Sequence, residues 1–133
     1  MKQPFLPFFK PYDSVKQKSV YISGPMTGYR KFNAPAFAKC TAALRELGYA
    51  VCSPSETDQI LGTLTHEEYL RFDFARVLEA DFVVALEGWQ YSDGARAELV
   101  VAARIGIPIW SWENWTDYHR IRYPEIMQAV SYE

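Results

Sequence analysis

The chain has 133 residues, of which 49% are hydrophobic and 16% aromatic, and its net charge is −2. This length and composition predict one globular domain and exclude a disordered protein. The apolar runs are too short to span a membrane, no export signal opens the chain, and no basic stripe suggests a nucleic-acid groove. We therefore expect a cytoplasmic protein.

The first 18 residues differ in character from the rest of the chain. Pro4, Pro7 and Pro11 alternate with aromatic residues, a pattern that suits neither a helix nor an interior strand. This arm either packs in an extended form on the domain or on a partner subunit, or it is disordered. Residues 19–133 are then expected to form a single α/β domain.

Strands and helices alternate along the rest of the chain. Apolar runs predict strands at 20–23, 49–53, 81–86 and 107–110. Helices are predicted between Asn33, as N-cap, and Gly48, behind a capping box at 65–68, and over about 95–105. Connections this short are typical of a parallel sheet with right-handed crossovers. We therefore predict a flavodoxin-like (Rossmann-like) three-layer sandwich with strand order 2-1-3-4(-5).

Two glycine-containing loops follow the first and third predicted strands. The strand order places the loop 24–28 beside the loop 88–94, at the carboxyl edge where open α/β sheets bind their ligands. The second loop can aim backbone N–H groups, together with a helix N-terminus, at an anion. The first loop contains neither a P-loop lysine nor a GxGxxG pattern, which argues against a triphosphate or a dinucleotide.

Two carboxylates are expected near this edge. Glu98 falls in the first turns of the helix after the second loop, and there it suggests attack on carbon rather than on phosphorus. It could instead only complement the helix dipole. Asp73 lies in an aromatic run on the preceding helix and could act as a second acid, or it could be an exposed acid paired with Arg71 or Arg76.

The two cysteines do not suggest a metal site. Cys40 and Cys52 are not spaced as a metal-binding pair, and no Cys/His cluster accompanies them. We expect both to be small buried apolar residues with reduced thiols.

Three motifs occur in the order and spacing of a known superfamily. They are Tyr-Ile-Ser-Gly-Pro-Met-Thr-Gly at 21–28, Asp73 followed by Ala-Asp-Phe-Val-Val-Ala at 80–85, and Gly-Ala-Arg-Ala-Glu at 94–98. Over residues 19–110 the chain resembles the nucleoside 2-deoxyribosyltransferase superfamily, and within it a small group, often phage- or prophage-borne, with the same Gly-Pro-Met-Thr-Gly turn. Members of the superfamily exchange the bases of deoxynucleosides or hydrolyse nucleoside 5′-monophosphates at the N-glycosidic bond.

The resemblance implies a role for each matching residue. Glu98 would be the nucleophile, Asp73 would position the sugar or help to protonate the base, and Tyr21 would lie near the reacting groups. Ser92 and Gly94 match the phosphate-binding serine of the monophosphate glycosidases and the glycine that follows it. The residues expected to contact substrate or phosphate are Ser23, Gly24, Pro25, Met26, Thr27, Gly28, Gly88, Ser92 and Gly94.

The chain departs from the superfamily in two places. The glycosidases usually offer a serine and an arginine to phosphate from the first loop, and here Arg30, Lys31 or Arg96 could substitute. In this superfamily the C-terminal region of a neighbouring subunit often completes the site. The corresponding region here contains Trp110, Trp112, Asn114 and Trp115. Its rings either stack on a base or belong to the core or to a dimer face.

These observations predict an enzyme that cleaves or transfers the N-glycosidic bond of a (deoxy)nucleoside or its 5′-monophosphate, without a metal or organic cofactor. Two other functions fit the same residues, namely a non-catalytic nucleotide-binding module and a glycohydrolase of NAD-like or nucleotide-sugar substrates. The surplus of aromatic residues predicts a homodimer or larger assembly, with the arm or the tail at the interface. No nucleic-acid or membrane partner is expected.

Overall fold

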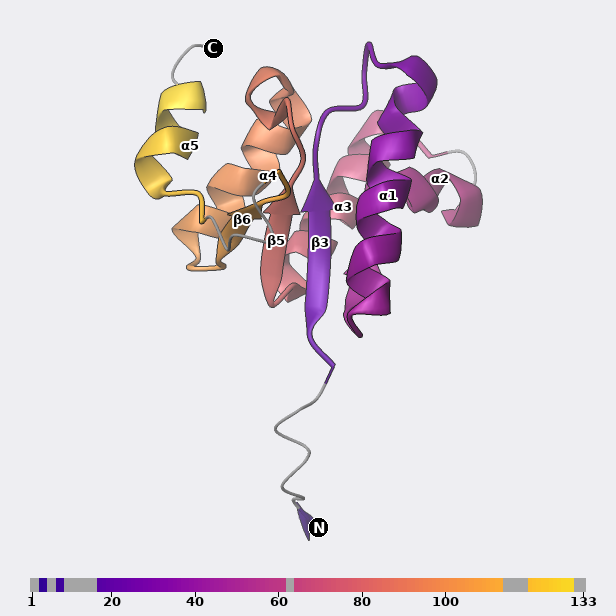
Figure 1. The fold of residues 1–133 in the computed structure, drawn as a ribbon, viewed down its shortest axis with the longest axis vertical. Coiled ribbons are helices and arrows are strands. Elements are labelled where there is room, and N and C mark those ends of the chain that lie inside the picture. The colour runs from indigo at the N-terminus through magenta and orange to yellow at the C-terminus, as the bar shows by residue number, and fades with distance from the viewer. Residues whose placement is uncertain (1–2, 5–6, 9–16, 62–63, 114–119, 131–133) are drawn as a thin grey trace.

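A four-stranded parallel sheet forms the centre of the protein. The computed structural model describes residues 3–4, 7–8, 17–61, 64–113 and 120–130. The sheet is built from β3 (Ser19–Ser23), β4 (Ala50–Cys52), β5 (Phe82–Ala85) and β6 (Ile109–Ser111), in the order β4-β3-β5-β6 (Figure 1). This is the predicted order 2-1-3-4, so the predicted fold class is confirmed.

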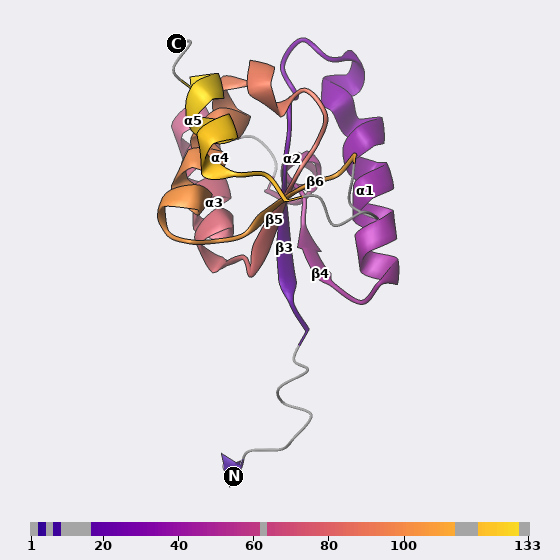
Figure 2. The same ribbon diagram turned by 60° about the vertical axis from the view of Figure 1, so that its left-hand side comes forward.

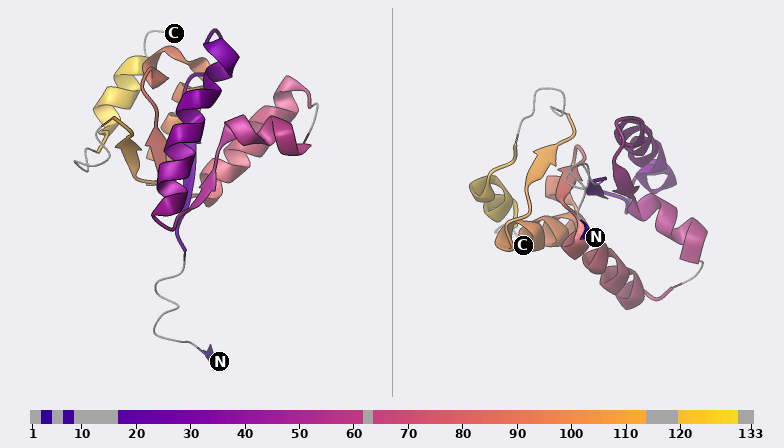
Figure 3. Two further views of the ribbon diagram at one scale, coloured as in Figure 1. Left: turned by 45° about the vertical axis from the view of Figure 1, so that its right-hand side comes forward. Right: turned by 90° about the horizontal axis from the view of Figure 1, so that it is seen from below.

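Helices cover both faces of this sheet. On one face lies α1 (Ala34–Glu46), and on the other lie α3 (His66–Glu79) and α4 (Asp93–Arg104) (Figures 1 and 3). The helix α2 (Pro54–Leu61) follows β4, and α5 (Tyr123–Val130) lies beside α4 (Figure 2). Among the described residues, no helix combines the length and the apolar character that crossing a bilayer requires.

The central strand β3 divides its side chains between the two faces. Val20 and Ile22 belong to the apolar cluster on the α1 side, whereas Tyr21 belongs to the cluster on the α3 and α4 side. Since successive residues of a strand point to opposite faces, Ser23 lies on the same face as Tyr21. This alternation sends two side chains with hydroxyl groups toward α4.

The helix ends follow the sequence signals in two cases and depart from them in a third. The Thr65 capping box is present, and Gly48 has a φ of 98° just beyond α1, as predicted. Asn33 precedes α1, but its side chain makes no capping hydrogen bond. Its amide instead donates to the carbonyl oxygen of Pro25 at 2.9 Å. The prediction that Asn33 caps α1 through its side chain was therefore wrong, because the side chain ties back to the preceding loop.

Several short elements were missed from the sequence. The sequence patterns did not predict α2, which begins at Pro54, a residue whose fixed φ and missing N–H suit the first helical position. The helix α5 was missed because the aromatic residues around it obscured its pattern. The helix α4 begins two residues before the expected start, because the Ser92 hydroxyl accepts a hydrogen bond from the Ala95 N–H and so caps it.

The N-terminal arm is described only in part. Two-residue strands β1 (Gln3–Pro4) and β2 (Pro7–Phe8) pair antiparallel, and the chain resumes at residue 17. The remainder of the predicted arm lies outside the described residues, as do Asn114, Trp115 and His119 of the tail.

Candidate active site

Glu98 is a buried carboxylate in the second turn of α4. Only 7% of its surface is exposed, although the helix presents other positions to solvent. It points toward the carboxyl half of β3, and both of its oxygen atoms accept hydrogen bonds from that strand. The Tyr21 hydroxyl donates to Oε2 at 2.8 Å, and the Ser23 hydroxyl donates to Oε1 at 2.7 Å. A residue that only complemented a helix dipole would be exposed, so the geometry favours a site role for Glu98.

The period of the strand explains this pair of donors. Tyr21 and Ser23 are two residues apart on β3, so both side chains project toward the same face. Both are fully buried. The Ser23 hydroxyl, which is expected to contact substrate or phosphate, donates to Glu98. The sequence contained a signal for this arrangement, namely two hydroxyl groups at i and i+2 on a strand whose carboxyl end faces an acidic helix residue.

The electrostatics of Glu98 reflect a balance between burial and hydrogen bonding. The pKa of its carboxyl group is raised from 4.5 to about 7. Burial is the main cause and the negative charge of Asp73 adds to it, while the hydrogen bonds from Ser23 and Tyr21 act in the opposite direction. The pKa of Tyr21 is raised well above 10.0, first by burial and then by the charges of Glu98 and Asp73. Tyr21 therefore remains a protonated donor throughout the physiological range.

Asp73 belongs to the same electrostatic environment. It lies on α3, one turn before the fully buried Val77, and both α3 and α4 cover the Tyr21 face of the sheet. Its charge raises the pKa values of Glu98, Tyr21 and Cys52. Arg76, one of the alternative partners considered for Asp73, pairs with Glu79 at 3.1 Å and lies over the Phe72 ring. Asp73 is half-buried on the side of the candidate site.

The predicted substrate loops contact each other closely. A Cβ atom at Gly24 would lie 2.8 Å from the Cβ atom of Leu86, and one at Gly88 would lie 2.6 Å from the Tyr29 hydroxyl and 3.3 Å from Pro25. Gly88 also has a φ of 90°. These two glycines therefore let the β3–α1 and β5–α4 loops pack together. This packing role comes in addition to any contact that they make with substrate.

The rest of the first loop forms a turn. The Tyr29 N–H donates to the carbonyl oxygen of Met26 at 3.1 Å, and Gly28 has a φ of 85°, which suits the third position of a type II turn. Thr27 and Gly28 are exposed, Met26 is half-buried and packs against the α1-side cluster, and Pro25 is buried.

Side chains of the protein already make hydrogen bonds around the N-terminus of α4. The Ser92 hydroxyl caps the helix, while Gly94 has open space where a Cβ atom would be. Arg96, considered as a substitute for a phosphate-binding arginine, is buried. Its guanidinium group donates to the Gln90 carbonyl oxygen at 2.7 Å and pairs with Asp93. Arg96 therefore stiffens this loop, whereas Arg30 and Lys31 are exposed.

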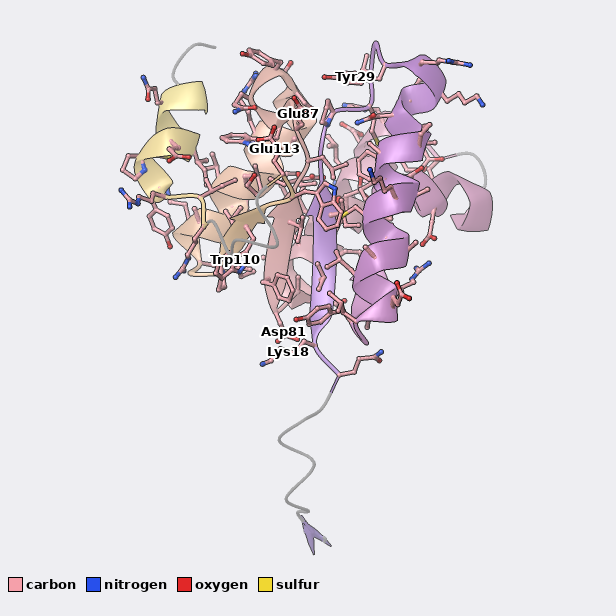
Figure 4. All side chains as sticks on the ribbon, viewed as in Figure 1. Lys18, Tyr29, Asp81, Glu87, Trp110 and Glu113 are labelled. Carbon is pink, nitrogen blue, oxygen red and sulfur yellow. The ribbon has the colours of Figure 1, made fainter. Side chains whose placement is uncertain are left out.

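A cavity of about 850 Å³ opens on the other side of the carboxyl edge. It is lined by the start of α1, the β5–α4 loop and the residues after β6, and its lining does not include Glu98, Tyr21, Ser23 or Asp73. Tyr29, Glu87 and Glu113 lie at this end of the molecule, opposite the amino end marked by Lys18 and Asp81 (Figure 4). Gly88, one of the expected substrate contacts, lines this cavity together with the residues that follow it in its loop.

The remaining predicted groups have structural surroundings. Trp110 and Trp112 are half-buried and pack against the apolar cluster on the α1 side. Cys40 is buried and Cys52 is half-buried, and burial raises the pKa of their thiols to about 12 and about 11. Within the part of the chain that the structure describes, no three His, Cys, Asp or Glu side chains gather in a way that could hold a metal ion.

The sequence matches one family model. Residues 18–111, well over half of the chain, match the family described as "Domain of unknown function (DUF4406)". The chain belongs to the DUF4406 family. The matched span contains β3, α3 and α4, and with them every side chain of the candidate site. No curated protein matches the sequence of this DUF4406 protein.

Solved structures share its fold. A 2-deoxyribosyltransferase from the psychrotolerant bacterium Bacillus psychrosaccharolyticus is 20% identical with a TM-score of 0.61, over 81% of this chain and 95% of that chain. A conserved protein from Enterococcus faecalis V583 is 24% identical with a TM-score of 0.59, over 71% of this chain. The DUF4406 chain spans 62% of the length of the Enterococcus protein. The fold expected from the resemblance to the deoxyribosyltransferase superfamily is therefore confirmed.

Proposed function

We propose that this DUF4406 protein cleaves or transfers the N-glycosidic bond of a (deoxy)nucleoside or its 5′-monophosphate, with Glu98 as the nucleophile. The observation that carries this proposal is the buried Glu98 carboxylate, held by two hydroxyl donors of the central strand at the carboxyl edge of the sheet. The likeness of the fold to a 2-deoxyribosyltransferase supports the same class of chemistry.

The proposed reaction has two displacements at the same carbon. In the first, an oxygen of the Glu98 carboxylate bonds to C1′, and the base leaves with the electron pair of the glycosidic bond. A proton supplied by a nearby acid, for which Asp73 is the candidate, neutralises the leaving base. In the second displacement, water or another base attacks C1′ and releases the carboxylate. Attack by water gives hydrolysis, and attack by another base gives base exchange.

The hydrogen bonds to Glu98 suit this role. The two donors fix the carboxylate in one orientation, which lowers the entropic cost of attack. They also favour the charged form that a nucleophile needs, against the burial that disfavours it. Tyr21 and Ser23 would act as positioning residues.

The first test is product analysis with the full chain. Ribo- and deoxyribonucleosides and their 5′-monophosphates are incubated with and without a free acceptor base, and the bases and sugars are separated by chromatography. Release of free base supports hydrolysis, and a new nucleoside that appears only with the acceptor supports transfer. A nucleotide that binds in calorimetry and stays intact would reject the enzyme in favour of a binding module.

The second test is substitution of the nucleophile. Glu98→Gln is expected to lower turnover at least about a thousandfold, because the covalent step is lost. The matched control is Glu46→Gln, at an exposed glutamate at the end of α1, which should leave turnover unchanged. Near-normal turnover of Glu98→Gln would reject Glu98 as the nucleophile.

A further inference from the structure

The 850 Å³ cavity presents acidic and aromatic side chains to solvent. Glu87 and Glu113 are exposed carboxylates in its lining, and Tyr91, which also lines it, is 86% exposed. Trp112 and Tyr29 add two more rings, and Lys39 lines the α1 side. Clustered aromatic residues beside a polar rim are typical of protein interfaces rather than of an ordinary solvated surface.

Next to this cavity is a turn with the opposite charge. We call Arg30, Lys31 and Phe32 the basic turn. All three are exposed, and Phe32 is exposed over 65% of its surface. Tyr29 and Asn33 bracket the basic turn and both line the cavity, so the turn and the cavity share a rim.

The backbone of the basic turn is strained. Lys31 and Phe32 both have a φ of 53°, and Asn33 follows with a φ of 65°, which gives three consecutive non-glycine residues in the left-handed region. This conformation is disfavoured for L-residues, and for a bulky ring in particular. Phe32 nevertheless remains mostly exposed within its own subunit. A covering partner would supply the missing burial.

We propose that this surface is the interface of a homodimer, in which the basic turn of each subunit enters the acidic cavity of the other. A two-fold interface uses the same patch on both subunits, so a protrusion must lie beside the depression that receives its copy. The shared rim meets this requirement. Arg30 and Lys31 would then face Glu87 and Glu113 twice in each dimer, and Phe32 would contact the exposed rings of the partner.

Charge reversal provides the test. One variant carries Arg30→Glu with Lys31→Glu, and the other carries Glu87→Lys with Glu113→Lys. Each variant alone places like charges across both contacts and is expected to sediment as a monomer at micromolar concentration, where the unaltered chain sediments as a dimer. An equimolar mixture restores opposite charges at both contacts, so it is expected to form a heterodimer. The control reverses Glu46 and Glu125, which are exposed elsewhere, and should remain dimeric.

A second variant separates the interface from the fold. Phe32→Asn places a residue that tolerates positive φ at a strained position, so it should fold at least as stably as the parent chain. It is expected to weaken dimerisation tenfold or more. The proposal is overturned by a monomeric parent chain at micromolar concentration, by charge-reversed variants that stay dimeric, or by a mixture of folded variants that stays monomeric. These measurements need no substrate, so their failure would leave the proposed function intact.

Discussion

At the scale of single residues, the surroundings of Glu98 disfavour the charged form of its carboxylate, which the proposed reaction needs. Its pKa is raised to about 7, chiefly by burial, although the hydroxyl groups of Tyr21 and Ser23 act in the opposite direction. A charged carboxylate without water around it is costly unless donors replace that water. The two donors on β3 therefore lower the pH at which this carboxylate becomes charged.

The pH dependence of activity should report this balance. Because Glu98 must be charged to act as the proposed nucleophile, turnover is expected to rise with pH through about 7. Ser23→Ala removes a hydrogen bond that favours the charged form, so the midpoint should move to higher pH, with a larger loss of turnover at pH 6.5 than at pH 8.5. Tyr21→Phe should move it in the same direction. Thr41→Val, which removes a buried hydroxyl from α1 on the opposite face, is the control. An unchanged midpoint in Ser23→Ala would contradict the positioning role.

The free energy of unfolding should fall as pH rises, whereas turnover should rise. Between pH 4.5 and about 7 the folded chain retains a proton on Glu98 that the unfolded chain has released, so unfolding becomes easier as pH rises. The stability that this raised pKa contributes is fully present below pH 4.5 and is lost as pH rises through about 7. The loss is about 3 kcal/mol at most, from the size of the shift.

Glu98→Gln is the direct test of this linkage. The amide does not titrate, so the free energy of unfolding of the variant in urea should lack this decline. The variant should therefore become more stable relative to the parent chain between pH 5 and pH 8. A variant that loses activity while gaining stability at pH 8 is expected of a functional carboxylate. Parallel stability curves for the two proteins would show that burial does not raise the pKa of Glu98 as described.

At the scale of elements, the site depends on two loops that approach each other closely at two glycines. Gly24 and Gly88 allow the loop after β3 to contact the loop after β5. The Leu86 N–H donates to the Ser23 carbonyl oxygen at 2.8 Å, so this contact continues the pairing of the strands beyond β3 and β5. The position of Ser23 is fixed by the same contact.

Alanine substitutions should separate close approach from backbone strain. Gly24→Ala places a Cβ atom 2.8 Å from Leu86 and should lower the free energy of unfolding by about 1–3 kcal/mol. Gly88→Ala adds the cost of a positive φ to a clash with Tyr29, and Tyr29→Phe should relieve part of that clash in the double variant. Gly106→Ala, at a φ of 82° with open space around it, measures the strain alone, about 1 kcal/mol or more. Equal losses in Gly88→Ala and Gly106→Ala would exclude a packing role for Gly88.

At the scale of the whole molecule, the domain extends past the segment that matches the family. The family model ends at residue 111, but α5 lies at 123–130 and packs against α4, the helix that carries Glu98. Ile121 and Ile126 belong to the same apolar cluster as Tyr21. The C-terminal helix therefore belongs to the core that holds α4 and Tyr21 in place.

Removing one buried side chain from α5 should show this support. Ile126 is fully buried, so Ile126→Ala should lower the free energy of unfolding by about 2–5 kcal/mol, the cost of a cavity in the core. Met127→Ala, at an exposed position of the same helix, should change it little. Urea denaturation followed by circular dichroism measures both. A small loss for Ile126→Ala would mean that α5 does not contribute to the core.

The sequence by itself determined the architecture. Apolar runs of strand length, Gly48 after the first helix and the Thr65 capping box are local signals, and the short connections between them leave the parallel order β4-β3-β5-β6. The period of a strand also placed Tyr21 and Ser23 on one face. The three motifs indicated the superfamily fold.

The tertiary structure alone decided what those residues contact. Only the placement of α4 over β3 brings the Ser23 hydroxyl to Glu98. Asn33 was expected to cap α1, and its amide found the Pro25 carbonyl oxygen instead. The left-handed turn at Phe32 and the cavity beside it have no local signature. Burial, hydrogen-bond partners and pKa values depend on segments far apart in the chain, and a local sequence pattern does not specify which of them meet.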